Sequence, residues 1–118
     1  MLKKSSASVK VFYPRFCQEE VLERLAQGVK TLEAKLPLRS ASLFGSWASN
    51  RHTVASDIDV LVIYEGDPRA DAYAIIKRTL ELPGVEPHAY SEDEAKQMES
   101  TIRKMTRQSI VIYPKAKP

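Results

Sequence analysis

Two groups of residues, separated by ten positions, could act together in one chemical site. Gly45 and Ser46 follow the alternating segment 40–44, which the pattern predicts to be a strand. A strand that ends in Gly-Ser where a helical turn begins directs backbone N–H groups and a hydroxyl outward, and this arrangement suits a phosphate group. The sequence therefore predicts a phosphate-binding turn at Gly45 and Ser46.

Asp57 and Asp59 form the second group, and they lead directly into the apolar, β-branched segment 60–64. Residues two apart in a strand share a face, so both carboxylates are expected to point the same way. Adjacent carboxylates repel each other unless a cation lies between them, and oxygen ligands favour Mg²⁺ or Mn²⁺. A phosphate-binding turn close to a metal-binding pair is suited to phosphoryl or nucleotidyl transfer. The plainer alternative is a strand end with two solvated aspartates.

This combination resembles the signature of the polymerase-beta-like nucleotidyltransferases. A strand, Gly45-Ser46, a ten-residue spacing, Asp57-Ile58-Asp59 and a following apolar strand all agree with it. The short chain is most similar to the minimal nucleotidyltransferase branch, whose members often pair with a HEPN-domain protein as toxin–antitoxin systems. The resemblance implies an α/β (α+β) fold, with a mixed β-sheet and helices packed mainly on one face.

The resemblance also implies roles for individual residues. Gly45 and Ser46 would hold the phosphates of a nucleoside triphosphate, ATP being expected, while Asp57 and Asp59 would bind Mg²⁺ or Mn²⁺. A third carboxylate is expected on the next strand, where Glu86 is the acidic residue available. The family more often has Asp there, and the Pro87 that follows would remove a hydrogen-bond donor from a central strand. The alternative for Glu86 is a solvated glutamate at a strand edge.

The turn departs from the family pattern Gly-Ser-x-Ala-Arg-Gly, because Ser49 and Asn50 occupy its last two positions. Asn tolerates a left-handed backbone better than other non-glycine residues, so Asn50 is expected to keep the turn. The missing arginine removes a two-pronged phosphate contact, which neighbouring Arg51 could replace. The expectation is weaker triphosphate binding on an unchanged fold.

Three further side chains near the predicted site are each open to two interpretations. His88 shares a strand face with Glu86. It is either a base or nucleotide contact at the rim of the site, or a packing residue. His52 could touch phosphate or be solvated. Trp47 could stack on a base or cover the short helix.

Composition and charge narrow the function classes. The 118 residues form one domain, with residues 1–8 expected to be a loose tail, and the net charge of +3 does not require nucleic acid as a partner. The single Cys17 excludes an internal disulfide, and no segment resembles a membrane span or signal peptide, so a cytoplasmic protein is expected. One Cys and two separated His residues do not predict zinc. A homo-oligomer remains possible.

The remaining elements are predicted from periodicity and caps. Apolar residues at helical spacing over 18–35 predict a first helix ended by Pro37, and Asp67-Pro68 predicts the start of a second helix. Ser91 and Glu94 form a capping box before one helix that ends in basic residues, and the segments 85–90 and 109–113 predict strands. The order is helix, strand, short helix, strand, helix, strand, helix, strand.

The predicted reaction is metal-dependent transfer of a nucleoside monophosphate to an acceptor hydroxyl, with Glu86 suited also to the role of general base. The resemblance implies that a small helical HEPN-type protein carries the acceptor. The alternative is a catalytically weak antitoxin or binding subunit that acts by protein–protein contact. An antibiotic-modifying nucleotidyltransferase is disfavoured, because no second substrate-binding domain is evident.

Overall fold

A computed structural model describes residues 17–53 and 55–114 of the chain. The predicted loose tail at residues 1–8 lies outside the described residues. The elements, in order, are α1 (Gln18–Leu32), β1 (Leu38–Phe44), the 3-10 turn η1 (Gly45–Trp47), β2 (Ile58–Tyr64), α2 (Ala72–Leu80), β3 (Val85–Ser91), α3 (Glu92–Gln97), α4 (Glu99–Met105) and β4 (Ile110–Tyr113). The predicted order of helices and strands is confirmed, except that the two short helices α3 and α4 stand where one helix was predicted.

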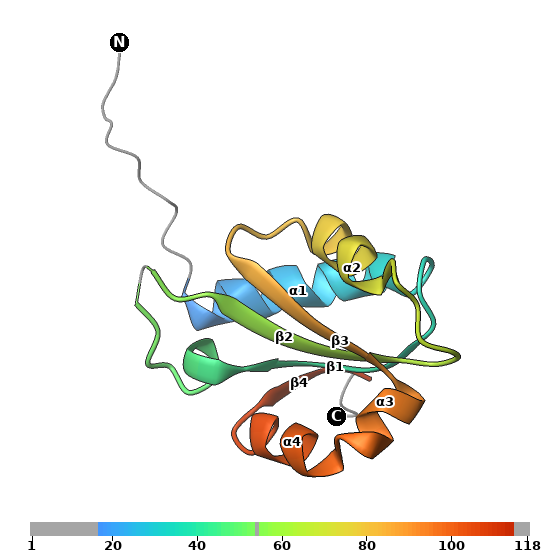
Figure 1. Cartoon of the computed structure of the whole chain (residues 1–118). Coiled ribbons are helices and arrows are strands. Elements are labelled where there is room, and N and C mark those ends of the chain that lie inside the picture. The colour runs from blue at the N-terminus through green and yellow to red at the C-terminus, as the bar shows by residue number, and fades with distance from the viewer. Residues whose placement is uncertain (1–16, 54, 115–118) are drawn as a thin grey trace.

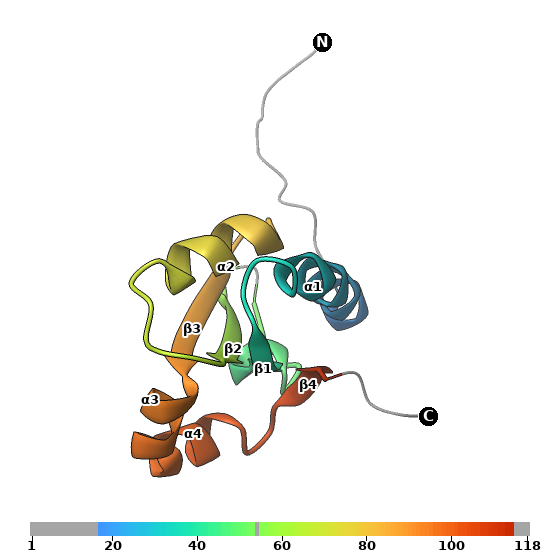
Figure 2. The same ribbon diagram turned by 90° about the vertical axis from the view of Figure 1, so that its right-hand side faces the viewer.

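The four strands form one mixed sheet in the order β3-β2-β1-β4. Strands β2 and β3 run parallel, joined by the α2 crossover, whereas β1 pairs antiparallel with both β2 and β4. Helices α1 and α2 cover one face of the sheet, and the α3–α4 segment lies on the other side (Figures 1 and 2). The predicted α+β fold with a mixed sheet is confirmed.

The hydrophobic core lies between the sheet and the α1–α2 layer. Along β2, Ile58, Val60, Val62 and Tyr64 are buried in this core, as strand alternation requires. Helix α1 contributes its predicted apolar stripe, of which Val21, Leu25, Val29 and Leu32 are buried. Helices α3 and α4, by contrast, contain no buried residue. The helix-covered face therefore supplies most of the burial.

Gly28 lets α1 and α2 approach each other closely. A Cβ atom at this position would lie 2.7 Å from Leu80 Cδ2 and 3.3 Å from Leu80 Cα. A glycine inside a helix costs roughly 0.5–1 kcal/mol relative to alanine. This close helix crossing explains why a glycine occupies the middle of an otherwise regular amphipathic helix.

The predicted start of the second helix was wrong. Helix α2 begins at Ala72 with Asp71 as its N-cap residue, rather than at Asp67-Pro68. The Arg69 backbone N–H donates to the Tyr64 hydroxyl at 2.9 Å, and the Arg69 guanidinium binds the Asp71 carboxylate through two 3.0 Å hydrogen bonds. These contacts hold the segment before Ala72 as a loop.

Two further expectations are refined. The helix after Ser91 is divided at Met98 into α3 and α4, although its predicted capping box is present, with Glu94 N donating to Ser91 Oγ at 3.1 Å. Pro87 lies on an edge strand of the sheet, where a missing backbone donor is tolerated. None of the helices in the described part of the chain combines the length and the apolar composition that a membrane span requires.

Candidate active site

The turn after β1 packs directly against the aspartate at the start of β2. Phe44 pairs with Asp59 across the antiparallel strands, and Gly45 follows with φ of +77°. A Cβ atom on Gly45 would lie only 2.7 Å from Asp59 Oδ2. Any other residue would therefore displace the carboxylate as well as strain the backbone. The fold therefore brings Gly45 of the predicted phosphate-binding turn next to Asp59 of the predicted metal-binding pair.

The turn itself is held by its own backbone. Ala48 and Ser49 donate their N–H groups to the Gly45 carbonyl at 3.1 and 3.2 Å, and Arg51 N–H donates to the Ser46 carbonyl at 2.8 Å. Asn50 has φ of +62°, which confirms its predicted left-handed conformation. The Arg51 side chain reaches back to this turn, with Nε donating to Ser49 Oγ at 3.3 Å. The cationic Arg51 side chain thus lies beside the predicted phosphate-binding turn, two positions after Ser49, which stands where the family has arginine.

Hydrogen bonds between Thr53 and Ser56 hold the loop that leads from this turn to Asp57. Thr53 N–H donates to Ser56 Oγ at 2.8 Å, and Ser56 N–H donates to the Thr53 carbonyl at 3.0 Å. Asp57 follows at once and is exposed, whereas the Asp59 side chain is 28% exposed. The two carboxylates therefore differ in setting, since one is free to adjust and the other is confined by the turn.

Trp47 belongs to the core instead of to a base-stacking surface. It is only 6% exposed, and its ring lies parallel to the His52 ring with a centroid separation of 3.6 Å and an interplanar angle of 5°. Gln18 of α1 donates through Nε2 to the carbonyls of Trp47 and Ala48 at 2.8 and 3.1 Å. Of the two interpretations of Trp47, packing over the short helix is the one observed, and His52 is a stacking partner, not a solvated loop residue.

His88 contacts the confined aspartate from the neighbouring strand. His88 Nε2 lies 3.2 Å from Asp59 Oδ1, and the Phe44 ring packs edge-on against the imidazole at 5.0 Å between centroids. Asp59 is therefore flanked by Gly45 on one carboxylate oxygen and by His88 on the other. Of the two interpretations of His88, the structure favours a place in the site.

Glu86 lies beside Asp59 in the strand register, but its carboxylate is held elsewhere. Strands β2 and β3 pair Asp59 with Glu86, so the two residues occupy neighbouring positions in the sheet. Tyr73 Oη donates to Glu86 Oε2 at 3.1 Å, and Lys77 Nζ lies 3.8 Å from Glu86 Oε1. Both partners come from α2. Neither Tyr73 nor Lys77 is predicted as a site residue from the sequence, where only their helical i,i+4 spacing links them.

The structure agrees only in part with the predicted metal site. Asp57 and Asp59 supply the carboxylate oxygens that Mg²⁺ and Mn²⁺ prefer. Among residues 17–53 and 55–114, however, no group of three His, Cys, Asp or Glu side chains is gathered for metal binding. The assignment of Asp57, Asp59 and Glu86 as metal ligands, and of Gly45 and Ser46 as phosphate ligands, stays a prediction. Glu86 could join the other two only after leaving Tyr73 and Lys77.

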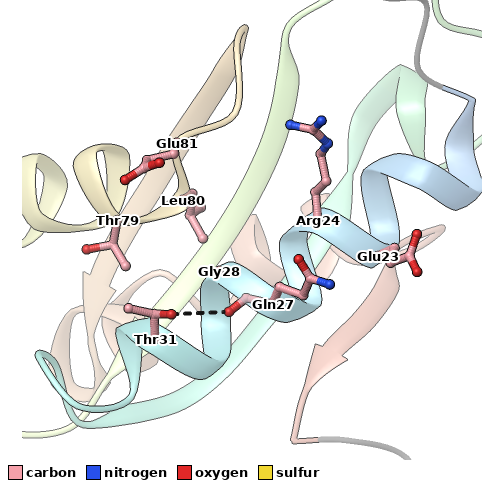
Figure 3. Close-up of a pocket in the computed structure, with 8 residues that line it drawn as sticks. All are labelled: Glu23, Arg24, Gln27, Gly28, Thr31, Thr79, Leu80 and Glu81. Atoms are coloured by element: carbon pink, nitrogen blue, oxygen red, sulfur yellow. Dashed lines mark hydrogen bonds between the residues drawn. The ribbon is translucent and has the colours of Figure 1, made fainter.

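A groove of about 510 Å³ lies between α1 and α2, apart from these residues (Figure 3). Its walls are Glu23, Arg24, Gln27, Gly28, Thr31, Thr79, Leu80 and Glu81. None of the site residues predicted from the sequence lines it. The groove is lined by both acidic and basic side chains, and Gly28, where α1 and α2 approach closely, forms part of its wall.

Comparison with known proteins identifies the family. The nucleotidyltransferase domain family matches residues 22–114, which is most of the chain. A candidate protein adenylyltransferase of Methanocaldococcus jannaschii is 42% identical over 45 residues, which cover 38% of this chain and 46% of that protein. The match thus spans about half the length of this relative.

Two solved structures share the fold. The crystal structure of a nucleotidyltransferase candidate from Sulfolobus solfataricus has a TM-score of 0.60 and 19% identity, covering 80% of this chain and 81% of that one. A toxin–antitoxin structure with AMP-PNP has a TM-score of 0.56 and 15% identity, covering 76% and 73%. The family and the enzyme class predicted from Gly45-Ser46 and Asp57-Ile58-Asp59 are confirmed: the chain belongs to the nucleotidyltransferase domain family.

Proposed function

We propose that this protein transfers AMP from ATP to a hydroxyl group on a partner protein and releases pyrophosphate. The observation that carries the proposal is the contact between the Gly45 turn and the Asp59 carboxylate, with Glu86 next to Asp59 in the strand register. The relative from M. jannaschii is described as a candidate protein adenylyltransferase, and a structural neighbour is a toxin–antitoxin structure with AMP-PNP. Both descriptions support an adenylyl donor and a protein partner.

The turn at the end of β1 would bind the phosphates. In the proposed mechanism, backbone N–H groups near Gly45 and the Ser46 hydroxyl orient the triphosphate, and Arg51 adds positive charge from beside Ser49. Because phosphoryl transfer needs little covalent participation by the protein, orientation and charge neutralisation supply most of the catalysis. Gly45 is required here, since a side chain would occupy the space next to Asp59.

Asp57 and Asp59 would hold Mg²⁺ or Mn²⁺, which would neutralise the charge on the transferring phosphate. Asp59 is confined by Gly45 and His88, so its carboxylate is already oriented before nucleotide binds. Asp57 is exposed and can adjust its position. Glu86 is suited to accept the proton of the attacking hydroxyl, because it is 40% exposed and adjoins Asp59 in the sheet.

The partner that we propose is a small helical HEPN-type protein, as the sequence resemblance implies. The second candidate function is a binding subunit that neutralises such a partner by contact alone. Two observations favour this second candidate: the Glu86 carboxylate is occupied by Tyr73 and Lys77, and Ser49 stands where the family has arginine. The intact Gly45–Asp59 contact favours the enzyme.

Calorimetric titration of ATP in the presence of Mg²⁺ separates the two candidates. We expect the wild type to bind ATP and the double variant Asp57→Asn/Asp59→Asn to lose metal-dependent binding. The rate of AMP transfer by this double variant should fall by at least about 10²–10³-fold. Asp67→Asn, an exposed aspartate outside the site, is the matched control and should bind as the wild type does. If the folded wild type bound no nucleoside triphosphate, the stand-alone enzyme would be excluded and the contact subunit favoured.

A further inference from the structure

Tyr73 presents an accessible hydroxyl next to the carboxylate proposed to act as a base. The residue lies in the first turn of α2 and is 42% exposed, an unusual exposure for a large aromatic side chain in this fold. Its Oη donates a 3.1 Å hydrogen bond to Glu86 Oε2. The phenol is therefore both reachable from solvent and already directed at a proton acceptor.

Lys77 completes this arrangement from one helical turn further along. Its Nζ donates to Tyr73 Oη at 3.4 Å and lies 5.7 Å from the centre of the Tyr73 ring. An ammonium group at this distance stabilises negative charge that develops on the phenol oxygen as its proton leaves. The hydroxyl thus contacts both a base and a cation, which also lie 3.8 Å from each other, and such neighbours can activate an oxygen nucleophile.

The strand register connects this hydroxyl with the proposed nucleotide site. Glu86 is paired with Asp59 in neighbouring strands, and the Asp59 carboxylate touches the Gly45 turn. The proposed phosphate-binding turn, metal-binding aspartate, base and phenol therefore form a chain of adjacent groups. The Tyr73 hydroxyl is linked to the Asp59 position through Glu86, and a hydroxyl carried on the same chain as the nucleotide site would react with an entropic advantage over one that arrives by diffusion.

We infer that Tyr73 is a self-adenylylation site: in the absence of another acceptor, the chain transfers AMP to its own Tyr73 hydroxyl. The inference rests on the proposed function. The Tyr73 oxygen forms a bond to the α-phosphorus of ATP as the bond from that phosphorus to the pyrophosphate oxygen breaks. The phenol proton passes to the Glu86 carboxylate, and the products are the tyrosyl–AMP ester and pyrophosphate. Modification also removes the Tyr73 hydrogen bond, one of the two contacts that hold Glu86 on α2.

The test is to incubate the purified chain alone with ATP and Mg²⁺ and to measure its intact mass and tryptic peptides. Cleavage after Arg69 and Lys77 releases the peptide 70–77, in which Tyr73 is the one hydroxyl-bearing side chain. We expect this peptide to gain the mass of one adenylyl group. Tyr73→Phe should abolish the gain, and Glu86→Gln should slow it by about 10²–10⁴-fold.

Two controls separate modification from a purely structural role of Tyr73. Tyr90→Phe, which removes a partly buried hydroxyl from β3, should leave the mass gain intact, whereas Asp59→Asn should eliminate it. The fraction modified at a fixed time should not depend on protein concentration, because the transfer is intramolecular. A rate that rises with concentration would overturn transfer within one chain, and a label on any other peptide would overturn the assignment to Tyr73.

ATP binding measured on the same preparation distinguishes failure of this inference from failure of the proposed function. Asp59-dependent binding of Mg²⁺-ATP with an unmodified peptide 70–77 would refute self-adenylylation and leave the proposed function standing. An absence of ATP binding would refute both. A folded Tyr73→Phe variant that still bound ATP would show that the lost mass gain reflects the missing hydroxyl and not a disrupted site.

Discussion

The two faces of the sheet are built for different tasks. On the face covered by α1 and α2, β2 buries alternate residues from Ile58 to Tyr64 in a continuous apolar core. On the other face, Asp59 lies partly exposed beside His88, and the α3–α4 segment that shares this side of the sheet buries no residue completely. One strand thus contributes its even-numbered residues to stability and an odd-numbered residue to the candidate site.

This division explains how the site can hold polar groups without destabilising the fold. Burying a charged group costs free energy unless it is paired, and Asp59 avoids most of that cost by remaining partly exposed. The site face is not entirely polar, because Leu61 is buried there, two residues from Asp59. We therefore expect substitutions on the covered face to change stability and those at the Gly45–Asp59 contact to change nucleotide binding.

The largest stability effect is expected from the covered face. Leu25→Ala removes a fully buried side chain from α1, and the free energy of unfolding should fall by about 2–5 kcal/mol. Urea denaturation measures the change. Val111→Ala, at a side chain that is 61% exposed, should change it by less than about 0.5 kcal/mol. If folded Leu25→Ala failed to bind ATP, the two faces would not be separable in function.

A pair of glycines sharpens the comparison, because their added Cβ atoms would meet neighbours at the same distance. Gly28→Ala places a Cβ 2.7 Å from Leu80 on the covered face, and Gly45→Ala places one 2.7 Å from Asp59 in the site. We expect each to lower the free energy of unfolding by about 1–3 kcal/mol, from overpacking at Gly28 and from overpacking with a left-handed backbone at Gly45.

Nucleotide binding should distinguish the two glycine variants. Calorimetry at a temperature where both are folded should show ATP binding by Gly28→Ala and its loss in Gly45→Ala, since only the latter displaces the Asp59 carboxylate. Equal binding by both variants would mean that the close approach of Gly45 to Asp59 has no role in the site.

The sequence predicted what depends on local pattern. The apolar stripe of α1 follows from helical periodicity, the turn from Gly45, and the left-handed residue from Asn50. Each of these features is determined by residues within a few positions of one another. The family resemblance rested on the same local group and was confirmed by the match over residues 22–114.

Contacts between distant parts of the chain could not be predicted in this way. The hydrogen bond from Arg69 N to Tyr64 Oη delays α2 despite a favourable Asp67-Pro68 start. The Trp47–His52 stack depends on how a loop folds back, and the contact between His88 and Asp59 depends on a parallel register set by the crossover. None of these contacts has a periodic signal in the sequence.

A smaller effect is expected at the junction between β3 and α3. Ser91 is buried and accepts a hydrogen bond from Glu94 N, so Ser91→Ala should cost about 0.5–2 kcal/mol. Hydrogen exchange should show the loss mainly in α3 and α4, because these helices bury little surface of their own. Ser100→Ala, in the exposed part of α4, is the control and should change exchange very little. Uniform acceleration across α1 would instead show that both sides of the sheet unfold together.

The smallest effect concerns the loop before α2, on the rim of the covered face. The two hydrogen bonds from Arg69 lower the pKa of the Asp71 carboxyl, and the nearby positive charge adds to this effect. A carboxyl whose pKa is lower in the folded state stabilises the fold above its unfolded pKa, which is about 3.9, and this stabilisation is lost as the pH falls through the folded value.

Asp71→Asn should therefore lower the Tm slightly at pH 7, and the difference from the wild type should disappear in strong acid. The Asp71 side chain makes no capping hydrogen bond, so the variant tests its ion pair with Arg69 and not a helix cap. A Tm difference that stayed constant with pH would show that Asp71 acts through the geometry of the α2 N-terminus alone.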